Sequence, residues 1–123
     1  MKLKLLLPAF GLILLTGCAS QNTGLYDWGG YDDGLYEFYS NPEYKDEFTT
    51  NLVKHIEALD ARGTKPAPGL YAEAGTLMLK EGDKEQAVSY YEKEANAWPE
   101  SQPLMSALIS NLKEDDSEIS EEL

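Results

Sequence analysis

The chain has little of what metal and catalytic sites are usually built from. It contains one cysteine, Cys18, and one histidine, His55, among 123 residues. A lone imidazole without a cysteine or a second histidine nearby is a poor ligand set for zinc. Long apolar runs are missing as well: Leu5–Leu15 spans eleven residues, whereas a helix that stays in a bilayer needs about 20. The sequence therefore gives no support to a zinc site or to a membrane-spanning helix.

Basic residues are also scarce. The chain has 10 lysines and arginines against 22 aspartates and glutamates, which gives a formal net charge of −12. A field of this sign repels phosphate backbones, so nucleic acid is a poor partner. Anionic lipid headgroups are repelled too, so any membrane attachment has to come from something other than a basic patch. The simplest role of the negative charge is to keep the protein soluble.

The first 17 residues have the parts of a secretory signal. Lys2 and Lys4 form a basic start, the short apolar stretch follows, and small residues precede a break. Leu15, Thr16, Gly17 and Cys18 at that break resemble the bacterial lipobox. A thiol is the side chain that forms a thioether with diacylglycerol, and small residues let the signal peptidase approach the backbone. A buried or free cysteine is the alternative, but an unpaired thiol is a liability in an oxidising compartment.

The lipobox resemblance implies a lipid anchor. We expect cleavage between Gly17 and Cys18, which leaves residues 1–17 as a signal peptide and Cys18 as the new N-terminus. The implied modification is diacylglycerol on the thiol and an acyl chain on the amino group. Several acyl chains give stable membrane attachment, where one chain is marginal. Residue 19 is Ala rather than Asp; Asp resembles the inner-membrane retention signal, so we expect the outer membrane, facing the periplasm.

Residue composition divides the rest of the chain into three parts. Residues 18–24 are small and polar, which predicts a flexible tether. Residues 113–123 contain six acids, which predicts a disordered acidic tail. The folded domain is then expected to cover residues 25–112.

Within that domain the apolar residues recur with a helical period. Asn41 and Pro42 are a plausible helix start, and Asp83 with Gln86 has the spacing of a capping box. Four apolar stripes follow from this period: Phe48, Leu52, Ile56 and Leu59; Leu70, Ala74, Leu77 and Met78; Ala87, Tyr91, Ala95 and Trp98; and Leu104, Leu108 and Leu112 with Met105 and Ile109. The sequence predicts an all-α fold.

Residues 68–99 resemble one tetratricopeptide repeat, a helical hairpin of about 34 residues. The matching positions are Tyr71, Gly75, Gly82, Ala87, Tyr91 and Pro99. Small residues at 75 and 87 allow two helices to approach closely, while the tyrosines fill the space beside them. Met78, Lys84 and Glu94 depart from the pattern, which weakens packing onto a following standard repeat. We expect a tetratricopeptide-like hairpin with flanking helices, capped by the last helix, with a four- or five-helix bundle as the alternative.

A fainter half-repeat lies upstream of this hairpin. Gly30 with Tyr31, then Gly34, then Phe38 have the spacing of a turn, a small residue and an aromatic residue. Because one repeat cannot bury its own apolar face, neighbouring helices are required on both sides.

A wider resemblance covers roughly residues 24–112. It rests on the lipobox together with Tyr26–Tyr31, Leu35–Tyr39, Pro68–Glu73, Tyr91–Glu94 and Trp98–Ser101. These segments are similar to a family of short uncharacterised bacterial lipoproteins. Members of that family are typically encoded beside a lipoprotein similar to the curli-secretion channel and beside a second small lipoprotein. The resemblance implies a genomic setting, with the channel-like lipoprotein as a possible partner. It implies no biochemical activity.

Two sets of residues are candidates for a partner surface. Seven of the 13 aromatic residues lie between positions 26 and 44, including Trp28 and Tyr31. Aromatic rings are enriched at binding hot spots, but in a small domain they more often form core, and we expect core here. In tetratricopeptide proteins the first helices line a groove, and the groove positions here are Ala72, Thr76 and Leu79. They lack a basic clamp for a peptide carboxylate, so a helix-docking surface is more plausible.

The remaining candidates do not make a site. His55 lies beside an apolar stripe and is expected at the boundary of the core, without a nucleophile to activate. Asp27, Asp32 and Asp33 do not follow a calcium-loop pattern, because Gly29 and Tyr31 stand between them. We therefore expect a non-enzymatic scaffold or adaptor in envelope assembly or secretion, with no cofactor beyond the covalent lipid. The alternative is a module that uses the aromatic cluster to bind a small ligand or an envelope polymer.

Overall fold

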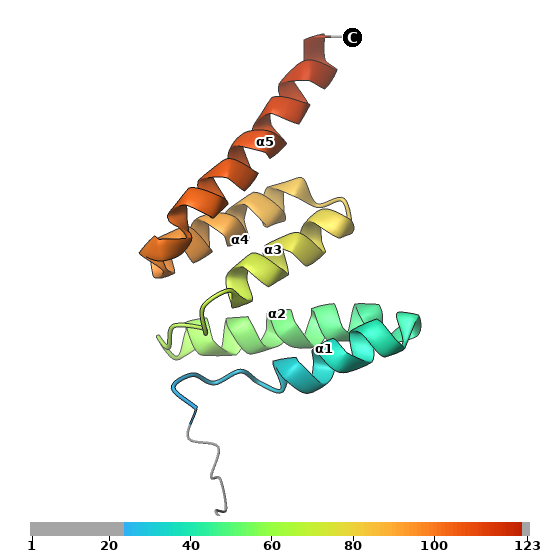
Figure 1. Ribbon diagram of the computed structural model, residues 1–123, viewed down its shortest axis with the longest axis vertical. Coiled ribbons are helices and arrows are strands. Elements are labelled where there is room, and N and C mark those ends of the chain that lie inside the picture. The colour runs from blue at the N-terminus through green and yellow to red at the C-terminus, as the bar shows by residue number, and fades with distance from the viewer. Residues whose placement is uncertain (1–23, 122–123) are drawn as a thin grey trace, which may run out of the picture.

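The computed structural model describes residues 24–121, and side chains as far as residue 114. The chain is all-α over this range, with no strand among residues 24–121, as the sequence predicts (Figure 1). The helices are α1 (Tyr31–Ser40), α2 (Lys45–Ala61), α3 (Leu70–Lys80), α4 (Lys84–Ala97) and α5 (Gln102–Glu121), with short 3-10 turns at Pro42–Tyr44 and Pro99–Ser101. Each helix packs against the next one along the chain.

The predicted helix starts are confirmed by their hydrogen bonds. The Asn41 side chain accepts a hydrogen bond from the Glu43 backbone N–H at 3.1 Å and opens the 3-10 turn before α2. The Asp83 carboxylate accepts from the Gln86 backbone N–H at 3.0 Å, and the Gln86 side chain donates back to it at 2.9 Å. Side chains thus satisfy N–H groups that a helix start leaves without a partner.

The hairpin of α3 and α4 depends on small residues where the helices cross. A Cβ atom added to Gly75 would lie 2.8 Å from a ring carbon of Tyr91 and 3.0 Å from the Ala87 carbonyl oxygen. Ala87 and Tyr91 are themselves buried. Gly82 has a φ of 87° and makes the turn between the helices. The close approach predicted for Gly75 and Ala87 is therefore confirmed.

The first two helices form a second hairpin of the same kind. A Cβ atom on Gly34 of α1 would lie 2.9 Å from the Phe48 ring of α2. Side chains also join α1 to α3, since the Lys80 ammonium lies 5.6 Å from the centre of the Phe38 ring. The faint upstream half-repeat is thus a real helical hairpin, stacked beside the first helix of the next hairpin.

Glu94, which departs from the repeat pattern, is buried and holds three segments together. Its side chain is 1% exposed. Its Oε1 atom accepts a hydrogen bond from the backbone N–H of Gly69, at the start of α3, at 2.9 Å. The same oxygen accepts from the Ser101 hydroxyl, before α5, at 3.1 Å. The N-cap Gly69 has no side chain to cap α3, so Glu94 of α4 supplies the acceptor from a distance.

The last helix differs from expectation in two ways. Met105 and Leu112 are buried, but Leu104 is 61% exposed and does not belong to the buried stripe. The predicted disordered tail begins at residue 113, whereas α5 continues to Glu121 and extends away from the other helices (Figure 1). A helix that is already formed adds one hydrogen bond for each further residue, and lysine and glutamate are good helix formers. The charge run therefore does not end the helix.

The signal peptide, Gly17, Cys18 and all but the last residue of the predicted tether lie outside the described residues. In the part of the chain that is described, no helix is long and apolar enough to cross a bilayer.

A polar network at the edge of the core ties α2 to the second hairpin. The Tyr71 hydroxyl donates a hydrogen bond to the Asp60 carboxylate, and the Lys93 ammonium lies 3.1 Å from the other oxygen of that carboxylate. Burial raises the pKa of Tyr71 above its usual 10.0, and the hydrogen bond to Asp60 raises it further. Burial also raises the pKa of Tyr90 and of Tyr31.

Tyr71 should make stability depend on alkaline pH. A pKa that is higher in the folded state stabilises the fold fully below the unfolded-state pKa of 10.0, and this contribution decreases as the pH rises above it. We expect Tyr71→Phe to lower the free energy of unfolding by about 1–2 kcal/mol at pH 7. The difference from wild type should be unchanged at pH 9 and smaller at pH 11, as measured by urea unfolding. A difference that stays constant to pH 11 would contradict this assignment.

Candidate partner-binding site

The segment before α1 is fastened to α2 by Asp27. The Asp27 carboxylate accepts a hydrogen bond from the Gly29 backbone N–H at 3.1 Å and lies 3.6 Å from the Arg62 guanidinium. The Asp27 carbonyl oxygen lies 2.9 Å from Nε2 of His55. A Cβ atom on Gly29 would lie 2.5 Å from the His55 ring, so only glycine fits there. His55 is half-buried, as predicted for a boundary residue, and it positions this segment.

A continuous chain of aromatic rings crosses the same region. Its ring centres lie 5.2–6.5 Å apart in the order Trp98, Tyr26, Trp28, Tyr31, Phe48, Phe38 and Tyr39. Separations of this size are typical of favourable ring contacts. The rings come from the segment before α1, from α1, from α2 and from the end of α4. The chain of rings therefore joins the N-terminal segment to both hairpins.

The aromatic-rich segment is only partly core, so the prediction that it packs as core is half wrong. Tyr31, Phe38 and Tyr44 are half-buried and pack against the core. Trp28 is 41% exposed, and Tyr36 and Tyr39 of α1 are 71% and 77% exposed. Among the described residues, five of the six exposed large apolar side chains lie between positions 25 and 39. We call Leu25, Tyr26, Trp28, Tyr36 and Tyr39 the aromatic face.

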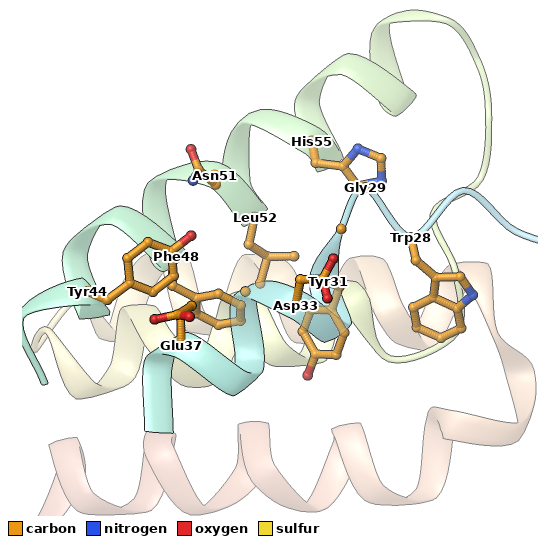
Figure 2. A pocket seen from close by; sticks show the side chains of 12 residues that line it. Trp28, Gly29, Tyr31, Asp33, Glu37, Tyr44, Phe48, Asn51, Leu52 and His55 are labelled. Carbon is orange, nitrogen blue, oxygen red and sulfur yellow. The ribbon is translucent and has the colours of Figure 1, made fainter. Parts of the chain in front are cut away.

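A pocket lies between the segment before α1, α1 and α2, with a volume of about 410 Å³ (Figure 2). Trp28 lies at one end of the pocket, and Glu37 lies near Tyr44 at the other end. Phe48 and Leu52 lie between the two ends. This volume is in the range of small-ligand sites. The pocket brings rings and carboxylates from three segments to one place.

The family model described as a domain of unknown function, DUF4810, matches residues 25–108. The chain belongs to this family. No curated protein and no solved structure matches the chain. The description of the DUF4810 family assigns no activity to the domain.

The two sets of predicted surface residues lie in different settings in the DUF4810 domain. Trp28 and Tyr31 are neighbours, with ring centres 6.2 Å apart, and both line the pocket. Ala72, Thr76 and Leu79 lie on one side of α3 and are half-buried. The Thr76 hydroxyl is already bonded to the Ala72 carbonyl oxygen at 3.0 Å and to the Tyr91 hydroxyl at 3.1 Å. These three residues therefore form a packed helix surface, whereas Trp28 and Tyr31 belong to the pocket.

Sequence reasoning missed the polar half of the site. Asp33 and Glu37 line the pocket from α1, and Asn51 lines it from α2. A spacing of four residues places Asp33 and Glu37 on one side of a helix, which is visible in the sequence, but the facing helix is not. Among the residues described, no group of three histidine, cysteine or acidic side chains is arranged to hold a metal ion.

Proposed function

We propose that the chain is a lipid-anchored, non-enzymatic adaptor that docks another envelope protein through the aromatic face. The observation that carries the proposal is the exposure of Tyr36, Tyr39 and Trp28 on a domain this small. Large aromatic side chains that are exposed together in one part of a chain mark interaction sites. The helical-hairpin scaffold supports a rigid helix surface of this kind, because α1 is held by Phe48 of α2 and by Lys80 of α3.

The position of the aromatic face supports an envelope partner. Cys18 is the proposed site of diacylglycerol and N-acyl attachment, and the aromatic face begins seven residues later, at Leu25. A fully extended chain spans at most about 3.6 Å per residue, so this segment reaches about 25 Å. Lipid attachment would therefore keep the aromatic face close to the bilayer. We propose the outer membrane, facing the periplasm, as the location.

The partner proposed first is the lipoprotein similar to the curli-secretion channel. This choice rests on the family resemblance of the sequence. A protein anchored in the same membrane would meet the aromatic face at a high effective concentration, because both proteins are confined to one surface.

Photo-crosslinking in cells tests the docking role. A benzophenone amino acid placed at Tyr36 or Tyr39 should give one discrete crosslinked product, identified by mass spectrometry as the channel-like lipoprotein. The matched control carries the same amino acid at Glu92, which is exposed on α4, and should give no such product. Identical products at all three positions, or none at Tyr36 and Tyr39, would refute docking through this face.

The pocket favours one second candidate, a module that binds a small ligand or an envelope polymer. Trp28, Tyr31 and Tyr44 could stack on a sugar ring, and Asn51 could accept and donate hydrogen bonds to it. Substituting Trp28 and Tyr31 separates the two candidates, since loss of the crosslink with an intact fold supports the adaptor. Retained crosslinking together with lost polymer binding supports the second candidate.

A further inference from the structure

The pocket between α1 and α2 has the lining of a site for a cation. Four of its side chains are aromatic: Trp28, Tyr31, Tyr44 and Phe48. Two are carboxylates, Asp33 and Glu37, and no lysine or arginine lines the pocket. Aromatic faces attract a cation within about 6 Å of the ring centre, and the attraction is larger where water is excluded. The aromatic rings and the carboxylates therefore both favour a positively charged ligand.

The two carboxylates have no cation of their own. Among the described residues, no ion pair or side-chain hydrogen bond engages the carboxylate of Asp33 or of Glu37, although other acids such as Asp27 and Asp60 are paired. The imidazole of His55, at the rim, is directed to the Asp27 carbonyl oxygen at 2.9 Å. The negative field in the pocket is thus left uncompensated by the chain itself.

The chemistry of the lining selects among cations. The rings of Trp28 and Tyr31 lie side by side, with centres 6.2 Å apart, and Asp33 lines the same part of the pocket. An aromatic ring beside a carboxylate suits a planar cation that stacks on the ring while its edge donates to the carboxylate. A guanidinium is planar and donates two parallel hydrogen bonds to a carboxylate, whereas an ammonium is a compact, strongly hydrated charge.

We propose that this pocket binds an arginine side chain of the protein that docks on the aromatic face. This inference rests on the proposed adaptor role, because Trp28 belongs both to the aromatic face and to the pocket. Asp33 pairs with the guanidinium, and Trp28 or Tyr31 stacks on its plane, while Glu37 at the other end of the pocket adds to the negative field. The strongly acidic chain, with 22 acids against 10 bases, attracts a basic segment at long range. The pocket then fixes the position of that segment.

Peptide titration into the 15N-labelled full chain in detergent micelles tests the inference by NMR. The probes are acetyl-Gly-Arg-Gly-amide and two matched peptides. One carries citrulline in place of arginine, which has nearly the same shape and no charge, and the other carries lysine. The Trp28 indole and the Asn51 side-chain amide report on the pocket. We expect saturable shifts with the arginine peptide, and at least tenfold weaker binding of the citrulline peptide and of the lysine peptide.

Conservative variants show where the peptide binds. Asp33→Asn and Trp28→Leu should each weaken binding of the arginine peptide about tenfold, and Glu37→Gln, which acts only through the negative field, should weaken it less. Glu92→Gln, an exposed site on α4 with the same change of charge, should leave binding unchanged and serves as the control. Amide spectra of each variant verify that the fold is intact.

Each outcome decides between the alternatives. Equal binding of arginine and citrulline peptides, or shifts caused by an N-acetylglucosamine disaccharide and not by arginine, would overturn the arginine site. Normal crosslinking at Tyr39 with no arginine binding would reject the pocket assignment and keep the adaptor role. Arginine binding without crosslinking would reject the adaptor role but would support the preference of the pocket for arginine.

Discussion

Replacement of Glu94 by alanine should lower the free energy of unfolding by about 3 kcal/mol. The Glu94 carboxylate is the acceptor for the Gly69 N–H at the start of α3 and for the Ser101 hydroxyl before α5. A hydrogen bond to a charged group contributes about 1.5–3 kcal/mol, and truncation also leaves a cavity in the core. For a domain whose total stability is about 5–15 kcal/mol, this is a large loss.

Two further variants separate the role of the Glu94 acceptor from its charge and from helix propensity. Glu94→Gln keeps the side-chain volume and one acceptor oxygen, so it should cost less than half as much as Glu94→Ala. Glu92→Ala changes an exposed residue of the same helix and should stay within about 0.5 kcal/mol of wild type. Urea unfolding followed by circular dichroism measures all three. If Glu94→Ala were as stable as wild type, position 94 would behave as the small-residue position of an ordinary repeat.

The helical framework could be predicted because its signals are local. The stripe of Phe48, Leu52, Ile56 and Leu59 is buried as predicted, and the Asp83 capping box forms. Gly75 was recognisable because close helix packing demands a small residue at a fixed distance from the turn. Each of these signals lies within one helix or one hairpin. Periodicity and capping rules are therefore sufficient for them.

The candidate site was harder to predict because it joins segments far apart in the sequence. Asp27 contacts His55 across 28 positions, and nothing local in the sequence pairs them. Exposure of Tyr36 and Tyr39 could not be read from an aromatic-rich segment, since half of that segment does pack on the core. Glu94 looked like a weak repeat position, because the partner N–H groups that it satisfies belong to other elements. Tertiary contacts decide these features.

Replacement of Cys18 by serine should remove nearly all of the protein from the outer-membrane fraction. A serine hydroxyl does not form the thioether that carries diacylglycerol, and the acidic chain has no basic patch to hold it at an anionic bilayer. Each acyl methylene buried contributes about 0.8 kcal/mol, so the loss of several chains changes membrane partitioning by many orders of magnitude. Ser20→Ala, a small change two residues downstream, is the matched control and should leave fractionation unchanged.

The most direct test of a lipid-anchored adaptor is metabolic labelling with an alkyne palmitate, followed by separation of membrane and soluble fractions. Wild type and Ser20→Ala should carry the label and sediment with the outer membrane. Cys18→Ser should be unlabelled, should remain at the size of the uncleaved chain and should lose the crosslink at Tyr39. A Cys18→Ser protein that is still cleaved, still sediments with the outer membrane and still crosslinks would contradict the lipid anchor.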